Sequence, residues 1–160
     1  METMGDVLYF AYGSNLDFDQ MKRRCPSARP VGVAKLPGRR LAFTRWSESR
    51  KGAVADAVAD PASEVWGVVY EITAGDLGRL DGHEGFTPGR SRNAYLREQC
   101  TVWLNGEEQR AVTAEVYFAV PSENPGLPSR DYRDQIFRGA REQGLPPDYI
   151  AQVLETIETQ

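Results

Sequence analysis

The stretch YLREQCTVWLNGEEQRAVTAEVYFAV, residues 95–120, decides the class of fold. Side chains alternate along Tyr95–Leu104, with leucine, cysteine and valine on one side and tyrosine, glutamine and tryptophan on the other. Val112–Val120 alternates again, with apolar residues at every second position. Asn105-Gly106, which lies between them, is the residue pair that tight hairpin turns prefer. The pattern predicts two antiparallel strands joined as a hairpin.

The other strands are predicted from short apolar or β-branched runs bounded by turn residues. These runs are Val7–Tyr12, Val31–Val33, Leu41–Trp46, Ala53–Ala59 and Val65–Ile72. We expect Pro37-Gly38 to form a turn between the second and third runs, and Asp60-Pro61 to close the fourth. The fifth run is apolar at nearly every position, which is typical of a strand covered on both faces.

Helices are predicted from capping residues and from apolar side chains at helical spacing. They cover 17–24, 74–83, a segment between Ser129 and Gly144, and a segment around 150–157. Strands come first, with helices inserted among them and then appended. This order predicts one α+β domain over residues 1–160, with a small, mixed, mostly antiparallel, barrel-like sheet and flanking and C-terminal helices.

Composition and charge exclude several classes of function. Lys and Arg total 19 and Asp and Glu total 23, a formal charge of −4, which argues against a broadly basic nucleic-acid-binding surface. No apolar run approaches the ~20 residues that cross a bilayer, so we expect no membrane partner. The start of the chain has no basic segment typical of a secretory signal. Cys25, Cys100 and His83 make no metal-ligand pattern, so we expect a cytoplasmic protein without a metal.

Two segments carry residues that a plain fold does not require. In Tyr9–Leu16 a strand runs into Gly13-Ser14-Asn15, where successive backbone N–H groups can converge on an anion or a developing oxyanion. In Leu80–Phe86 two acids and the single histidine lie at the end of a predicted helix, an unfavourable place for a carboxylate. The plainer alternatives are an ordinary strand–turn–helix junction and a solvated helix end, and the residue types alone leave both open.

Other candidates are weaker. Arg39-Arg40 and Arg90–Arg92 are typical of solvated charges, although they could bind a carboxylate. Tyr95 and Tyr132 could donate hydrogen bonds to a ligand, although half-buried tyrosines of this kind more often belong to a core.

In this order, the segments resemble the gamma-glutamylcyclotransferase family. Leu8–Leu16 is similar to the family's N-terminal signature, and Glu64–Tyr70 to the strand before its acidic helix. Leu80–Gly85 is similar to the segment that carries the family's catalytic glutamate. The C-terminal stretches Pro128–Tyr132 and Gly139–Tyr149 are similar to its final helices.

The resemblance implies an intramolecular reaction. The α-amine of a γ-glutamyl group attacks its own γ-carbonyl, a 5-oxoproline ring closes and the attached amino acid leaves, without a cofactor or metal. It implies that Glu84 is the general acid/base and that the substrate is a small γ-glutamyl molecule, and it leaves a homodimer open. By the same resemblance the substrate-binding residues are Tyr9, Phe10, Ala11, Tyr12, Gly13, Ser14 and Asn15, with Tyr95 and Tyr132.

One segment departs from the family pattern. Residues 87–94 are longer than the family leads us to expect, and we expect this loop to line or cover the pocket, with Arg90 or Arg92 near the carboxylate of the leaving amino acid. Three alternatives stay open: a relative that cyclises γ-glutamyl amines or a γ-glutamyl-protected metabolite, a non-catalytic ligand-binding module, and a structural partner protein.

Overall fold

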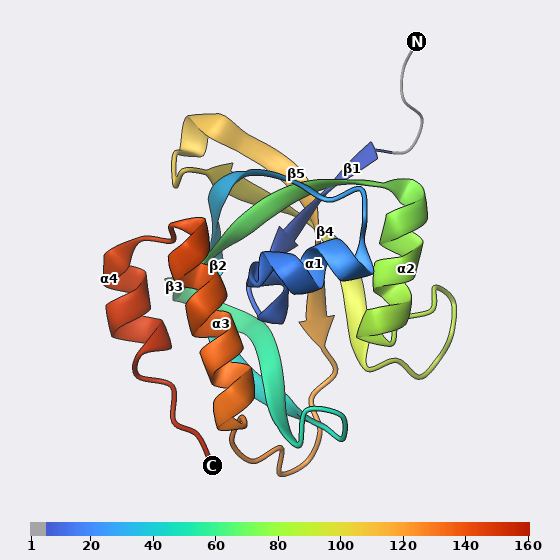
Figure 1. Cartoon of the computed structure of the whole chain (residues 1–160), viewed down its shortest axis with the longest axis vertical. Coiled ribbons are helices and arrows are strands. Elements are labelled where there is room, and N and C mark those ends of the chain that lie inside the picture. Colours follow the sequence, from blue (N-terminus) through green and yellow to red (C-terminus); the bar gives the residue numbers. More distant parts are fainter. Residues whose placement is uncertain (1–5) are drawn as a thin grey trace.

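The computed structural model describes residues 6–160, and its centre is a small closed barrel (Figure 1). The strands lie in the order β1-β3-β2-β4-β5 around the barrel. Neighbouring strands are antiparallel, apart from β1 and β5, which pair in parallel through Tyr9 and Glu115. The strands are β1 (Asp6–Ala11), β2 (Arg29–Ser47), β3 (Gly52–Thr73), β4 (Tyr95–Leu104) and β5 (Ala111–Ala119). The predicted α+β class with a mostly antiparallel, barrel-like sheet is confirmed.

Strands β4 and β5 confirm the predicted hairpin. They pair in register from Tyr95 opposite Ala119 to Trp103 opposite Ala111. Asn105 and Gly106 have φ values of 56° and 76°, the left-handed conformation expected of an Asn-Gly pair. The connection is longer than a two-residue turn, because a short 3-10 helix at Glu108–Arg110 follows before β5 begins.

The prediction of separate strands between residues 31 and 72 is wrong. Arg29–Ser47 is one strand and Gly52–Thr73 is another, and together they form a long, coiled hairpin. Pro37-Gly38 is a bulge within β2, where the register shifts and Gly38 has a φ of 79°. Asp60-Pro61 does not close a strand, since it lies in the stretch of β3 opposite that bulge, where a proline costs no ladder hydrogen bond.

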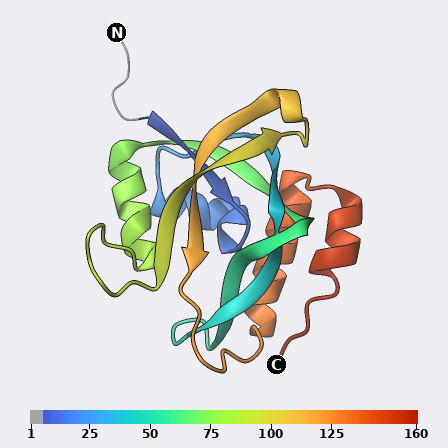
Figure 2. The same cartoon turned by 180° about the vertical axis from the view of Figure 1, so that it is seen from behind.

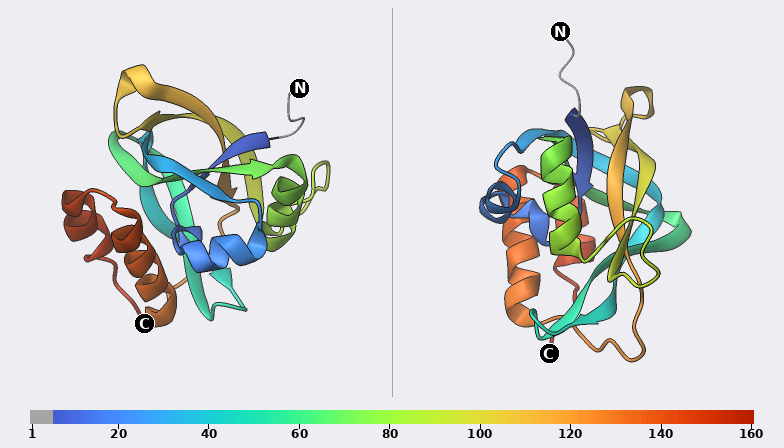
Figure 3. Two further views of the ribbon diagram at one scale, coloured as in Figure 1. Left: turned by 45° about the horizontal axis from the view of Figure 1, so that its top comes forward. Right: turned by 90° about the vertical axis from the view of Figure 1, so that its right-hand side faces the viewer.

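The helices gather on one side of the barrel. Figure 3 shows this arrangement from the side, and in Figure 2, the view from behind, the strands of the barrel face the viewer. The helices are α1 (Phe18–Arg24), α2 (Ala74–Glu84), α3 (Arg130–Gln143) and α4 (Pro147–Tyr149), which continues as a π-helical turn over Ile150–Leu154. Side chains cap the two longest helices at their start, since Thr73 and Ser129 accept the backbone N–H groups of Asp76 and Tyr132. The predicted end of α3 is confirmed, with Gly144 in the left-handed conformation.

The core lies inside the barrel and between the barrel and helices α1, α2 and α3. Phe10, Leu16, Tyr70, Leu80 and Ile136 are each fully buried there. Helix α3 approaches the chain just after β1 so closely that a Cβ on Gly139 would lie 2.5 Å from the Leu16 carbonyl carbon. No helix among residues 6–160 combines the length and apolar character needed to cross a membrane.

Candidate active site

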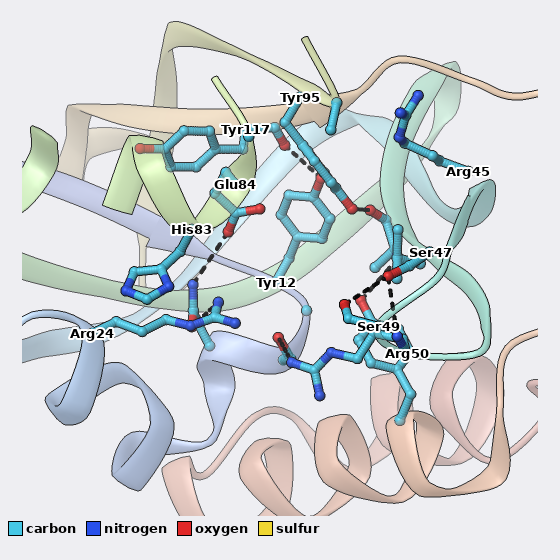
Figure 4. Close-up of a pocket in the computed structure, with 18 of the residues that line it drawn as sticks. Tyr12, Arg24, Arg45, Ser47, Ser49, Arg50, His83, Glu84, Tyr95 and Tyr117 are labelled. Carbon is cyan, nitrogen blue, oxygen red and sulfur yellow. Dashed lines mark hydrogen bonds between the residues drawn. The ribbon is translucent and has the colours of Figure 1, made fainter. Parts of the chain in front are cut away.

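A cavity of about 430 Å³ lies where three parts of the chain meet (Figure 4). They are the turn after β1, the C-terminal end of α2 and the tip of the β2–β3 hairpin. Tyrosines and arginines account for much of its wall. Its lining includes Tyr9, Tyr12, Ser14, Asn15, Arg24, Arg45, Trp46, Ser47, Arg50, His83, Glu84, Tyr95, Tyr117 and Tyr132.

The turn after β1 presents backbone donors to this cavity. β1 ends at Ala11, and a single 3-10 turn at Ser14–Leu16 follows Gly13. Among the hydrogen bonds of residues 6–160, the backbone N–H groups of Gly13, Ser14 and Asn15 find no acceptor. The first N–H groups of any helical turn lack a partner inside the helix. Because Gly13, Ser14 and Asn15 also line the cavity, these donors are available to an anionic group bound there.

Asn15 is the most extensively hydrogen-bonded residue of the turn. Its side-chain Nδ2 donates to the Tyr9 hydroxyl at 3.0 Å, and its Oδ1 accepts from Gln20 at 3.0 Å and Arg24 at 3.2 Å. Its backbone carbonyl accepts the Tyr70 hydroxyl at 2.9 Å. The same Nδ2 lies 3.5 Å from Glu84 Oε1. These bonds orient the amide so that its donor group faces the glutamate.

Glu84 is the last residue of α2, and its side chain is partly buried in the cavity wall. Burial raises the pKa of its carboxyl to about 7 against the opposing charges of Arg24 and Arg50, with a smaller upward contribution from the charge of Asp81. A carboxylate at a helix C-terminus is also disfavoured by the helix dipole. A carboxyl with a pKa near neutrality is half protonated at neutral pH, so it can both accept and donate a proton.

The cavity wall contains five tyrosines whose hydroxyl groups are held by the protein. Tyr12 donates to the carbonyl of Tyr117 at 2.5 Å, and Tyr95 to the carbonyl of Ala55 at 2.6 Å. Tyr132 accepts the Ala55 backbone N–H at 3.0 Å, and burial raises its pKa to about 12. These tyrosines are therefore neutral at physiological pH, and they give the cavity a rigid aromatic wall.

Tyr117 connects the wall to α2. Its hydroxyl donates to Asp81 Oδ1 at 2.6 Å, and Asp81 also lies 3.0 Å from Arg97 Nε. Arg97 in turn pairs with Glu115 at 3.1 Å. This buried network holds the last turn of α2, and hence Glu84, against β4 and β5.

His83 also lines the cavity. His83 is largely exposed, but partial loss of solvent and the nearby positive charge of Arg24 lower its pKa, so the imidazole is neutral at physiological pH. Residues 6–160 contain no group of three histidine, cysteine, aspartate or glutamate side chains placed to hold a metal ion.

The structure brings most of the predicted site residues together. Those that line the cavity are Tyr9, Tyr12, Gly13, Ser14, Asn15, Glu84, Tyr95 and Tyr132. Phe10 and Ala11 do not, since both are fully buried in the core.

The long loop plays a smaller part than we expected. Of residues 86–94, only Ala94 lines the cavity, and the structure places Arg90 and Arg92 outside it. Arg90 donates to Asn93 Oδ1 at 3.1 Å and to the Gly85 carbonyl at 3.2 Å, so it stabilises the loop itself.

Three arginines that the sequence analysis did not single out do line the cavity: Arg24, Arg45 and Arg50. Arg24 ends α1, whereas Arg45 and Arg50 flank the tip of the β2–β3 hairpin. No sequence signal pointed to the last two, because that hairpin was itself not predicted. Within residues 6–160, none of the three has a carboxylate within 4.0 Å.

Comparison with known proteins indicates the same family as the motifs in the sequence. The model of the AIG2-like family matches residues 64–153. A Bos taurus protein named gamma-glutamylcyclotransferase is 36% identical over 146 residues, which cover 89% of this chain and 74% of that protein. The Homo sapiens protein of the same name is 34% identical over 155 residues, covering 94% and 78%. The chain belongs to the gamma-glutamylcyclotransferase family.

The structure of the chain is also similar to solved structures of this family. A gamma-glutamyl cyclotransferase superposes with a TM-score of 0.86 at 33% identity, over 97% of this chain and 89% of the other. The resemblance stated from the sequence is therefore confirmed, and so is the fold it implied.

Proposed function

We propose that this chain is a gamma-glutamylcyclotransferase that converts γ-glutamyl amino acids into 5-oxoproline and a free amino acid. The observation that carries the proposal is the position of Glu84. Its carboxyl group, with a pKa near 7, shares one cavity with the backbone N–H groups of Gly13, Ser14 and Asn15, which have no acceptor within residues 6–160. A proton carrier and an anion-binding turn are the two groups that the cyclisation needs.

The reaction proceeds in two steps with balanced protons. The substrate α-amine is mostly protonated at neutral pH, so it must lose a proton before it attacks. Glu84 accepts that proton, a bond forms between the amine nitrogen and the γ-carbonyl carbon, and the carbonyl oxygen becomes an oxyanion. The oxyanion then reforms the carbonyl, and the bond to the leaving nitrogen breaks as Glu84 returns the proton to that nitrogen. The ring nitrogen loses its second proton to the released amine, which leaves as an ammonium ion.

The turn after β1 stabilises the oxyanion. Each well-placed donor of this kind typically contributes ~3–4 kcal/mol to the transition state. Asn15 keeps Glu84 oriented, and the rigid tyrosine wall holds the γ-glutamyl chain in a folded shape. Placing the amine against the carbonyl supplies a large proximity effect.

Arg24 and Arg50 bind the α-carboxylate of the γ-glutamyl group in this proposal. Arg50 donates to Ser14 Oγ at 3.2 Å and to Gln20 Oε1 at 2.9 Å, which places its guanidinium beside the turn. Arg24 donates to Asn15 Oδ1 from the other side. Both arginines act on the pKa of Glu84, so both lie close to the reacting end of the cavity.

The proposal also covers the type of substrate, the cellular location, the cofactor requirement and the oligomeric state. The substrate is a small molecule rather than a nucleic acid, in keeping with the net charge of −4. Cys25 and Cys100 are both free thiols, which fits a reducing, cytoplasmic location. The reaction as written uses no cofactor, and the homodimer stays a prediction that light scattering would test.

The test is release of 5-oxoproline from a panel of γ-glutamyl dipeptides and γ-glutamyl amines, with the Glu84→Gln variant as control. Release from dipeptides that the variant loses is the expected result. Release from amines alone would assign the chain to the alternative cyclotransferase activity. Tight binding of 5-oxoproline with no turnover of any substrate would instead indicate a ligand-binding module.

A further inference from the structure

The cavity has a second positively charged end, away from Glu84. Arg45 lies on the opposite side of the close-up from Glu84, at the tip of the β2–β3 hairpin (Figure 4). Arg24 donates to Asn15, whose amide faces Glu84, and Arg50 donates to Ser14 in the same turn. Arg45 donates instead to the carbonyl of Val120, just after the end of β5. The three cavity arginines therefore divide into two near the reacting carboxyl and one distant from it.

Arg45 is held in place but keeps most of its donors. It is half-buried, and its Nη1 donates to the Val120 carbonyl at 3.0 Å. The neighbouring backbone is also fixed, since the Trp46 N–H donates to Ser122 Oγ at 2.9 Å. A guanidinium has five N–H donors, so four remain for a ligand. Within the described chain, no carboxylate lies within 4.0 Å of Arg45.

The acid at the hairpin tip does not neutralise this charge. Glu48 lines the same end of the cavity, but it pairs with Lys51 at 2.5 Å and accepts the Trp46 indole N–H at 3.3 Å. Within residues 6–160, the hairpin tip thus offers the guanidinium of Arg45 without a carboxylate partner, the hydroxyls of Ser47 and Ser49, and the ring of Trp46, which is 42% exposed. A cation, small polar groups and an apolar surface are what a free amino acid needs from a binding site.

The substrate has two carboxylates at opposite ends. One belongs to the γ-glutamyl group, which the proposed reaction places at the Glu84 end beside Arg24 and Arg50. The other belongs to the leaving amino acid, which extends away from the reacting carbonyl. We propose, resting on the proposed function, that the hairpin tip is the leaving-group subsite, in which Arg45 binds the carboxylate of the departing amino acid. Arg45 is then a specificity-determining residue that favours γ-glutamyl amino acids over γ-glutamyl amines.

Two substrates that differ only in this carboxylate test the proposal. γ-Glutamyl-L-alanine and γ-glutamyl-ethylamine share every other group of the leaving moiety. The experiment compares kcat/KM on both for the wild type, Arg45→Gln, Arg45→Lys and Arg92→Gln. Arg92 is an exposed arginine outside the cavity, so it is the matched control for loss of one positive charge.

We expect the wild type to prefer the alanine substrate by about 10- to 100-fold, the usual effect of a hydrogen bond to a charged group. Arg45→Gln should lose most of this preference, mainly through a higher KM for the alanine substrate. Arg45→Lys keeps the positive charge but loses the planar N–H donors of the guanidinium, so its preference should lie between those of the wild type and Arg45→Gln. Arg92→Gln should keep the wild-type preference. The lysine variant also keeps the test valid should the glutamine variant fail to fold.

Three results would overturn the inference, and the failure of the inference alone can be told apart from the failure of the proposed function. An unchanged preference in both folded Arg45 variants would show that Arg45 does not bind the leaving group, although the chain is still a cyclotransferase. The absence of any preference in the wild type would show the same. No 5-oxoproline from either substrate would reject the proposed function, and the inference with it.

Discussion

Asn15 Nδ2 lies 3.5 Å from Glu84 Oε1, although 69 positions separate the two residues in the chain. One comes from the turn after β1 and the other from the last turn of α2. The contact joins the two segments that the sequence already set apart, the Gly-Ser-Asn turn and the acidic helix end. The turn and a carboxyl group with a raised pKa thereby face one cavity.

The first prediction concerns turnover. Glu84→Gln keeps the shape of the side chain but cannot accept a proton, and general acid–base catalysis typically contributes 10²–10⁴-fold. We expect 5-oxoproline release to fall at least ~100-fold in this variant while circular dichroism shows a folded protein. Glu142→Gln, an exposed glutamate on α3, should turn over at the wild-type rate. Wild-type activity in Glu84→Gln would remove Glu84 from the mechanism.

The second prediction concerns stability against pH. The pKa of Glu84 is about 7 in the folded chain against 4.5 for an ordinary glutamate, so between these values the folded state holds a proton that the unfolded state has lost. The free energy of unfolding therefore falls as pH rises from 4.5 to 7, by at most roughly 3 kcal/mol. Urea unfolding at several pH values should show this slope in the wild type.

Glu84→Gln is the control for that slope. The amide does not titrate, so the difference in unfolding free energy between variant and wild type should grow in favour of the variant from pH 4.5 to pH 7. A difference that stays constant with pH would mean that the carboxyl titrates normally in the folded protein.

The local signals in the sequence predicted local structure well. Ser129 and Gly144 mark the ends of α3, because a cap depends on a hydrogen bond made within one turn of the helix. The Asn105-Gly106 pair marks the β4–β5 hairpin for the same reason: its backbone conformation is decided by the two residues themselves. The turn at Gly13-Ser14-Asn15 and the acid at Glu84 were found because each is a local departure from a plain fold.

Features that depend on pairing between strands far apart in the sequence could not be predicted from local residues. Pro37-Gly38 and Asp60-Pro61 have the residues of turns, yet they lie in bulged parts of two strands that are held together by pairing along their whole length. Arg45 and Arg50 reach the cavity only because that hairpin folds over it, so no spacing in the sequence connects them with Glu84. Strand register is tertiary information, and the arginine part of the site depends on it.

The third prediction concerns the acid limb of the pH profile. The positive charge of Arg24 favours the carboxylate form of Glu84 and so lowers its pKa. Removing it in Arg24→Gln should raise that pKa, and the rise of kcat/KM with pH, centred near pH 7 in the wild type, should move to higher pH. Arg23→Gln removes the neighbouring charge, which is exposed on α1, and should leave the midpoint unchanged. An equal shift in both variants would indicate a general charge effect instead.

The fourth prediction concerns the packing that supports the turn. A Cβ on Gly139 would meet the Leu16 carbonyl carbon at 2.5 Å and the Asp17 nitrogen at 2.6 Å, and backbone atoms cannot give way as a flexible side chain can. Gly139→Ala should therefore push α3 off the turn, lower the free energy of unfolding by about 1–3 kcal/mol or more and raise KM.

Gly78 provides the matched control for that substitution. It lies exposed in α2, and a Cβ there would meet nothing within 4 Å. Gly78→Ala should increase the free energy of unfolding by about 0.5–1 kcal/mol, because alanine loses less conformational freedom in a helix than glycine does. Urea unfolding of the two variants and the wild type measures both changes in the free energy of unfolding, the expected decrease and the expected increase. A Gly139→Ala variant as stable as Gly78→Ala would show that α3 does not press on the turn, and that the turn keeps its shape without this helix.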